Sequence, residues 1–307
     1  MTLAKYFKKF MRVYGRQPRL LPVVEVLKQP IRGVMNPAFL PCDDPADYAI
    51  VCRQQYYAVD RRGIMIGDPS VEKTHNILFR QVLSRDGGAP EDGKRMSALQ
   101  GLEDARFYVH DGRLHLVASR LDLSAEKRTE IVLGYFPSLA TFYEGGDFVP
   151  CDVEGLLSRI EKNWVYFENE NRLMVERLPG MRDIYAFDPG LRRFSAAGVP
   201  QQHEVWSGTK SISWNGGNLF LDHKRVHVLT GTSTIVRFAY RFRFHASLRT
   251  PPQVSSEFSL APAEEGLVYA SDMQVMGDQL HIAVGIDDAR SQIFQLPSDE
   301  VARQLAL

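Results

Sequence analysis

The sequence has few cysteines and no net charge, and each absence narrows what the protein can be. Its 307 residues include three cysteines, Cys42, Cys52 and Cys151, none of them in a CxxC spacing. So sparse a set favours free thiols in a reducing compartment over a disulfide framework. Lysine plus arginine and aspartate plus glutamate both number 37. The overall charge therefore gives no reason to expect a nucleic-acid partner.

Long apolar runs and the common cofactor motifs are also missing. No apolar run approaches the roughly 20 residues needed to cross a bilayer. Basic residues interrupt residues 1–20, whereas a signal peptide contains an uninterrupted apolar stretch. We therefore expect a cytoplasmic protein. The sequence has no G-x-G-x-x-G, P-loop or G-x-S-x-G motif. His223 and His227 are four residues apart, but their segment predicts a strand, so we expect no metal and no cofactor.

The first residues have the spacing of an amphipathic helix. Apolar residues at i, i+3, i+4 and i+7 form one face: Leu3, Tyr6, Phe7, Phe10, Met11 and Tyr14. Basic residues occupy the rest: Lys5, Lys8, Lys9, Arg12 and Arg16. Such a helix can contact an anionic membrane, here at its inner face, or pack on its own domain with the lysines in solvent, and both interpretations stay open. We assign residues 1–30 to this helix and a lead-in, and residues 31–307 to one catalytic domain.

After about residue 30 the pattern changes to short strands separated by turns. A polar or glycine-containing turn followed by alternating apolar residues recurs at residues 47–51, 111–116, 169–175, 215–221 and 277–283. The repeats are spaced on the order of 45–65 residues, a range that indicates propeller blades. Each repeat has room for about four short strands. The sequence therefore predicts an all-β protein, a five-bladed β-propeller with the helix outside it.

In a propeller the inner strand ends of all blades face one axial pocket. Polar residues stand just before or within each predicted hairpin: Asn36, Arg53, Glu103, Asp104, Arg106, Lys162, Asn163, Lys210, His223 and Asp272. The acidic pair is the most informative, because a carboxylate beside an arginine and a second carboxylate has a tunable pKa. In an extended segment the Glu103 side chain should point away from that of Asp104.

Several of these segments resemble the five-bladed propellers of β-mannoside phosphorylases and related β-mannosyltransferases, a family like glycoside hydrolase family 130. The matching motifs are Asn36-Pro37-Ala38-Phe39, residues 101–106, residues 161–164, Leu221-Asp222-His223 and residues 284–288. The resemblance covers roughly residues 30 to 300. It implies that Asp104 is the general acid and that Lys162, His223 and Arg182 bind phosphate. Ala105 replaces the family's proline, and Ser271-Asp272 departs from its small-residue pattern, which bears on the sugar pocket.

One motif acid facing basic residues suits a reaction whose second group is itself an anion. Asp104 would exchange a proton with the acceptor hydroxyl or the leaving oxygen. The expected partners are a sugar donor, either a nucleotide sugar or a sugar phosphate, and a glycan acceptor. Our first expectation is an inverting glycosyltransferase that forms a β-mannoside-like linkage, since the N-terminal helix would hold it near lipid-linked acceptors. The alternatives are a β-mannoside phosphorylase and a non-catalytic carbohydrate-binding propeller.

Overall fold

The fold consists almost entirely of antiparallel strands, which confirms the all-β expectation. The computed structural model describes residues 13–14, 18–26, 31–42, 47–54, 57–59, 65–67, 75–82, 93–121, 129–154, 163–177, 180–198, 202–204, 206–230, 233–261 and 266–307. Within these ranges the helices are a 3₁₀ turn at Ser97–Leu99, α2 (Leu139–Glu144) and α3 (Ser298–Leu305).

In the described part of the chain, five sheets of four or more strands follow one another. The strand named first for each sheet below is called its first strand. The first sheet contains β5 (Met35–Leu40), β6 (Asp47–Gln54), β9 (His75–Val82) and β10 (Lys94–Arg95). The second contains β11 (Leu102–His110), β12 (Arg113–Leu121), β13 (Thr129–Phe136) and β14 (Val149–Pro150). The third contains β16 (Val165–Asn169), β17 (Arg172–Arg177), β18 (Gly180–Asp188), β19 (Arg193–Ala196), β15 (Asp152–Val153) and β20 (Gln202–Glu204).

The last two sheets also take strands from the N-terminal segment. The fourth contains β21 (Ser207–Trp214), β22 (Gly217–Thr230), β23 (Ser233–His245), β24 (Gln253–Val254), β25 (Phe258–Ser259), β1 (Val13–Tyr14) and β2 (Arg19–Leu20). The fifth contains β26 (Val268–Met276), β27 (Gln279–Ile286), β28 (Arg290–Pro297), β3 (Val24–Glu25) and β4 (Ile31–Arg32). A separate two-stranded ribbon pairs β7 (Tyr57–Val59) with β8 (Met65–Gly67).

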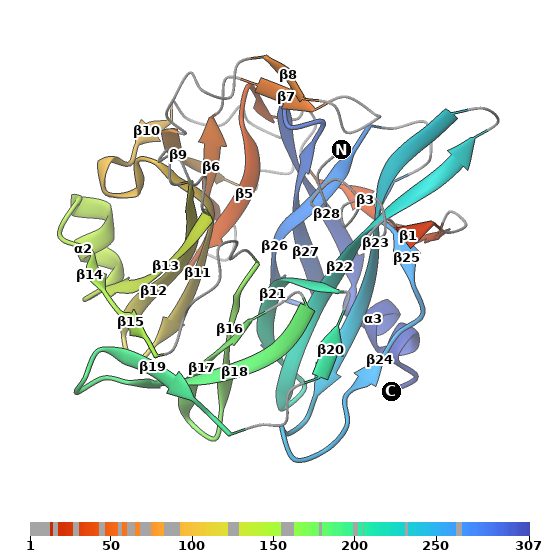
Figure 1. The fold of residues 1–307 in the computed structure, drawn as a ribbon. Coiled ribbons are helices and arrows are strands. Elements are labelled where there is room, and N and C mark those ends of the chain that lie inside the picture. The colour runs from red at the N-terminus through yellow and green to blue at the C-terminus, as the bar shows by residue number, and fades with distance from the viewer. Residues whose placement is uncertain are drawn as a thin grey trace, which may run out of the picture.

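The first strands of the five sheets form a closed ring. β5 contacts β11, β11 contacts β16, β16 contacts β21, β21 contacts β26, and β26 contacts β5 again. Figure 1 shows these strands near the centre of the molecule with the other strands of each sheet lying further out. The fold is therefore all-β and propeller-like, as predicted.

Tight turns explain why the repeated sequence pattern marks the hairpin between the first and second strands. Asp111-Gly112 joins β11 to β12, and Asn215-Gly216 joins β21 to β22, with positive φ at all four residues. Two consecutive residues with positive φ are typical of two-residue hairpin turns that match the strand twist. Glycine and asparagine or aspartate adopt that conformation with little strain.

The hydrophobic core is divided among the gaps between neighbouring sheets. One cluster joins Val117 and Leu133 of the second sheet to Trp164 and Phe194, which the third sheet contributes. Others join the first sheet to the second, the fourth to the fifth, and the fifth to the first. Most of the buried apolar side chains therefore pack between neighbouring sheets, whereas one small cluster, Trp206, Val226 and Ala239, belongs to the fourth sheet alone.

The described part of the N-terminal segment contains short strands and no helix. Residues 1–12 of the predicted helix lie outside the described residues, but Val13–Tyr14 pairs with β22 and Arg19–Leu20 pairs with β25. The prediction of helix over these two pairs of residues is wrong. The edges of β22 and β25 offer unpaired backbone groups, and pairing with them outweighs the local helical periodicity. β3 and β4 pair with β28 and so supply the outer strand of the fifth sheet.

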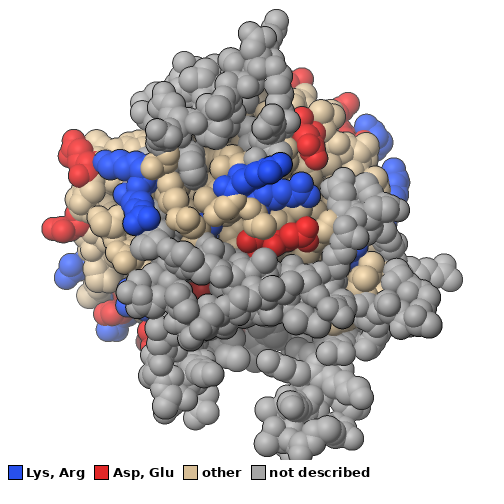
Figure 2. Space-filling view, turned by 90° about the horizontal axis from the view of Figure 1, so that it is seen from above, with Lys and Arg blue, Asp and Glu red and all other residues tan. Residues whose placement is uncertain are grey.

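The described surface carries charges of both signs. Figure 2 shows lysine and arginine side chains interspersed with aspartate and glutamate on the face seen from above. Among the described residues, no helix is long and apolar enough to cross a membrane.

Candidate functional site

The same irregularity occurs at the start of the first strand in four of the five sheets. The pairing of the first strand with the second shifts between Met35 and Ala38, Glu103 and Arg106, Gly208 and Lys210, and Ala270 and Asp272. Such β-bulges redirect side chains and are frequent next to active sites. Asn36 and Asp104 lie in bulges with φ of 48° and 53°, and Asn163, just before β16, has φ of 62°. Asparagine and aspartate adopt left-handed backbone with little strain, so these residue types suit the three positions.

Asp104 lies where the first and second sheets meet. Asn36 Nδ2 donates a hydrogen bond of 2.7 Å to Asp104 Oδ1, and Arg53 Nη1 lies 3.3 Å from the same oxygen. The Asp104 side chain is 20% exposed, whereas that of Arg53 is only 5% exposed. The carboxylate is therefore held by two buried neighbours and remains within reach of solvent and substrate.

Glu103 approaches the same arginine, which corrects the expectation that its side chain points away. Glu103 Oε2 lies 3.3 Å from Arg53 Nη1, the nitrogen that also contacts Asp104. The alternation of an ideal strand fails here because the bulge and the positive φ of Asp104 interrupt it. Two carboxylates consequently converge on one guanidinium group.

Arg106 connects the second sheet to the third and the fifth. Its Nη1 donates to the Trp164 carbonyl oxygen at 3.0 Å, and its Nη2 donates to Asn163 Oδ1 and to Tyr269 Oη, each at 3.1 Å. Arg106 itself is buried. Burial raises the pKa of Tyr269, and the nearby charge of Arg106 opposes that rise. The phenol therefore stays protonated and can donate a hydrogen bond.

His223 on β22 is buried beside this group. Its Nδ1 lies 2.8 Å from Thr209 Oγ1, and its ring meets the Tyr269 ring edge-on with centroids 5.1 Å apart. Burial lowers the pKa of His223 to about 3, and the charge of Arg106 adds to this, while Asp222 and Asp104 oppose it. At neutral pH the imidazole is uncharged, so towards an anion it acts as a hydrogen-bond donor rather than as a cation.

Lys210 and Asp272 form a buried pair between the fourth and fifth sheets. Lys210 Nζ lies 3.1 Å from Asp272 Oδ1 and also donates to the Phe107 carbonyl oxygen. The Phe39 amide donates to Asp272 Oδ2 at 2.9 Å. Burial raises the pKa of Asp272, and Lys210 counteracts this. The pair thus ties the first, second, fourth and fifth sheets together around the axis.

The structure brings most of the predicted site residues into one place. Direct contacts link four of them in one group: Asn36, Arg53, Glu103 and Asp104. Arg106 and Asn163 form a second group. The charges of Asp104 and Arg106 both act on His223. Lys162 lies outside the described residues. Arg182 lies on β18, the third strand of its sheet counted from the ring, where it pairs with Gln202. No group of three or more metal-ligating side chains occurs within the described ranges.

Thr209 and Tyr269 also lie at the site, although the sequence assigned no role to either. Thr209 lies in the bulge of the fourth sheet, and Tyr269 lies two residues before Ser271 in the bulge of the fifth. Both belong to the polar segments at residues 207–210 and 269–272, where functional side chains are expected. That polar character is the available signal, because the bulges depend on strand pairing.

Solved structures provide the comparison, since no protein-family model and no curated protein matches the sequence. A β-1,2-mannobiose phosphorylase from Listeria innocua is 14% identical with a TM-score of 0.57, over 94% of this chain and 95% of that one. A glycosyl hydrolase from Bacteroides ovatus is 10% identical with a TM-score of 0.59, over 94% and 95%. The chain shares its fold with the GH130 mannoside phosphorylases.

A further similar structure comes from the GH130 family of mannoside phosphorylases, which contains glycoside hydrolases that target β-1,2 mannosidic linkages in Candida mannan. It is 10% identical with a TM-score of 0.58, over 94% of this chain and 95% of that one. The resemblance inferred from the motifs is confirmed as a likeness of fold.

Proposed function

We propose that this protein is a glycoside phosphorylase that cleaves a β-mannoside-like bond with Asp104 as its proton donor. We further propose that the five sheets are the five blades of one propeller, with the substrate pocket on its axis. The observation that carries the proposal is the position of Asp104, a part-exposed carboxylate in a bulge, next to Arg53 and within the electrostatic reach of Arg106 and His223.

The similar structures favour phosphorolysis over transfer from a nucleotide sugar. Those reported above are named as a phosphorylase and as hydrolases. The nucleotide-sugar transferase that the sequence put first has no support of this kind. The proposed enzyme still transfers a hexosyl group, as expected from the sequence. The group passes to phosphate and not to a glycan.

In the proposed reaction a phosphate oxygen attacks the anomeric carbon from the side opposite the leaving oxygen. The bond from the anomeric carbon to the glycosidic oxygen breaks as the bond to the phosphate oxygen forms, so the configuration inverts. Asp104 gives its proton to the departing oxygen, and in the reverse direction it takes the proton from the acceptor hydroxyl. Arg106, with its neighbours Asn163, Tyr269 and His223, offers the charge and the hydrogen-bond donors that a phosphate requires.

Glu103 favours hydrolysis as a second candidate. Its carboxylate converges with that of Asp104 on Arg53, and most glycoside hydrolases use a pair of carboxylates. In that reaction water would replace phosphate, and the products would be two free sugars.

One experiment separates these reactions. Purified protein is incubated with β-1,2- and β-1,4-linked mannobioses with and without phosphate, and mannose 1-phosphate and free mannose are measured. We expect mannose 1-phosphate only when phosphate is present, and none from Asp104→Asn. Mannose released equally without phosphate would identify a hydrolase, whereas consumption of GDP-mannose with a mannoside acceptor would restore the transferase. Sugar binding without turnover would indicate a non-catalytic propeller.

A cytoplasmic location and a peripheral membrane contact through residues 1–12 are proposals that rest on the sequence. The motive is the basic and aromatic composition of that segment. Co-sedimentation with anionic vesicles, compared with neutral vesicles, tests the contact, and equal partitioning of the protein would remove it.

A further inference from the structure

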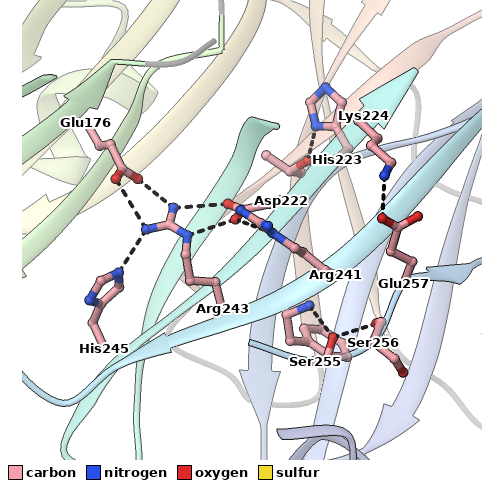
Figure 3. Close-up of polar contacts among 12 residues, drawn as sticks. Glu176, Asp222, His223, Lys224, Arg241, Arg243, His245, Ser255, Ser256 and Glu257 are labelled. Atoms are coloured by element: carbon pink, nitrogen blue, oxygen red, sulfur yellow. Dashed lines mark hydrogen bonds and ion pairs between the residues drawn. The ribbon is translucent and has the colours of Figure 1, made fainter. Parts of the chain in front are cut away.

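A buried cluster of charges joins the third and fourth sheets next to the candidate site (Figure 3). Arg243 on β23 donates from Nη2 to Glu176 Oε2 at 2.6 Å and from Nε to Asp222 Oδ2 at 2.8 Å. Arg241 Nε donates to the same Asp222 oxygen at 3.2 Å. Glu176 comes from β17, so the cluster crosses from one sheet to the next. Glu176, Asp222 and Arg243 are almost completely buried.

The neighbouring charges of this cluster hold Asp222 and Arg243 in their ionised states. Burial alone would raise the pKa of Asp222, but Arg243 and Arg241 hold it below its usual value. Burial would likewise lower the pKa of Arg243, but Asp222 and Glu176 raise it. His245 Nε2 lies 3.0 Å from Arg243 Nη1 and must accept the hydrogen bond, because arginine can only donate. His245 is therefore neutral in this arrangement.

A cluster of this kind is a poor source of stability and a good device for fixing geometry. The desolvation of buried ions offsets most of their attraction, so a well-packed apolar replacement is often as stable. Its best-attested role is to define register and orientation. The position of the cluster indicates which part of the molecule it holds in place.

The cluster lies at the point where β16 of the third sheet meets β21 of the fourth. Glu176 pairs with Val165 across β16 and β17, and Asp222 pairs with Gly208 across β21 and β22. A Cβ atom at Gly208 would lie 2.3 Å from Val165 Cγ2, so the two strands approach too closely for any larger residue. Directly beyond this contact, β16 leads to Asn163, and the bulge of β21 begins at Gly208.

The opposite face of the same strand carries a residue of the site. Successive residues of a strand point to opposite faces, and His223, which follows Asp222, packs against Tyr269 and contacts Thr209. The cluster thus holds β22 from the side of the third sheet, while His223 meets the fifth sheet on the other side. A shift of β22 relative to β16 would move His223 and Thr209 away from Asn163 and its partner Arg106.

We propose that Glu176, Asp222 and Arg243 are positioning residues, which hold Thr209 and His223 of the fourth sheet in place opposite Asn163 and Arg106. The identity of the ligand in this part of the pocket, phosphate, rests on the proposed function; the positioning itself rests on the contacts above. These three residues do not touch the substrate. They act through the strands that carry the residues that do.

The kinetic test compares Glu176→Gln and Arg243→Lys with a matched control. Asp183→Asn is that control, because Asp183 is buried, belongs to the same sheet as Glu176 and forms an ion pair of 3.0 Å with Arg177. We expect the KM for phosphate to rise about tenfold in both cluster variants with kcat changed much less, since small misplacements of binding groups weaken productive contacts strongly. The control should lower the melting temperature and leave KM unchanged. A purely structural role predicts lower melting temperatures in all three variants with no change of KM.

A second measurement does not depend on turnover. The ring signals of the eight histidines are recorded by NMR with labelled histidine, and His223→Gln assigns the signal of His223. Glu176→Gln and Arg243→Lys should shift that signal, and Asp183→Asn should not. An unchanged His223 signal in folded variants would overturn the positioning role, even if the wild-type enzyme proves to be a phosphorylase. Absence of phosphate-dependent turnover in the wild type would remove the proposed function, and the NMR result would still decide on positioning.

A failure to fold is also informative. Arg243→Lys keeps the charge and loses only the forked geometry, so it serves if Glu176→Gln does not fold. Should both variants and Asp222→Asn fail to fold while Asp183→Asn folds, the cluster is required for folding itself, and the inference is overturned.

Discussion

Asp104 combines a left-handed backbone conformation, which aspartate tolerates, with two buried hydrogen-bonding and charged partners. Replacement by asparagine keeps the size and tolerates the left-handed conformation, so the test removes the acid without changing the backbone. We expect Asp104→Asn to lose about 10²–10⁴ in rate, with a melting temperature close to that of the wild type. Activity within a few-fold of wild type, measured on mannobiose with phosphate, would exclude Asp104 as the proton donor.

His115 is a second residue whose surroundings determine a measurable property. It is completely buried among Tyr135, Tyr166 and Phe187, and neither ring nitrogen has a hydrogen-bond partner among the described residues. Burial lowers its pKa to about 3, with smaller effects from His110 and Arg113. The unfolded chain binds a proton near pH 6.5 and the folded one does not, so its contribution to stability is complete above that pH and is lost as the pH falls towards 3.

The pH dependence of unfolding tests this reasoning. Between about pH 6.5 and pH 4 the free energy of unfolding should fall by up to about 1.4 kcal/mol per pH unit for each such histidine. His223 contributes in the same direction. His115→Phe should reduce the slope by one histidine's share, measured by urea unfolding at pH 7 and pH 5. Identical slopes in wild type and variant would show that His115 is protonated in the folded state.

At the scale of elements, the strands β3 and β4 are important for the stability of the fifth sheet, although they are short. They complete the fifth sheet by pairing with β28. Removal of residues 1–33 exposes the edge of β28 and should cause aggregation or a large loss of stability. Thermal unfolding and light scattering of the truncated and the full-length protein check this, and equal stability of the two would contradict it.

The elements also show what the sequence could and could not predict. The hairpin turns at Asp111-Gly112 and Asn215-Gly216 were recognisable because the turn conformation requires those residue types. The bulge at Asp104 was not, because it depends on how β11 pairs with β12, and so the direction of Glu103 was predicted wrongly. Val13–Tyr14 became a strand for a similar reason, since its partner, β22, is distant in sequence. Local pattern predicted the repeats, and long-range pairing decided the exceptions.

At the scale of the whole molecule, the shared clusters between sheets predict how the protein unfolds. Phe242 lies in the cluster between the fourth and fifth sheets, is completely buried, and packs against Phe258 with ring centroids 4.8 Å apart. Because the large clusters are shared between neighbouring sheets, loss of one interface should open the ring for its neighbours. We expect Phe242→Ala to lower the free energy of unfolding by about 3–5 kcal/mol.

The loss should be felt throughout the ring. Unfolding followed by far-UV circular dichroism and by tryptophan fluorescence should give coincident transitions in wild type and variant. Hydrogen exchange in β12, on a sheet that does not contact Phe242 in the cluster, should accelerate as much as exchange in β23, because both amides then exchange through the same global opening. Faster exchange confined to the fourth and fifth sheets, or two separate transitions, would show instead that the sheets unfold independently and that the closed ring does not act as one cooperative unit.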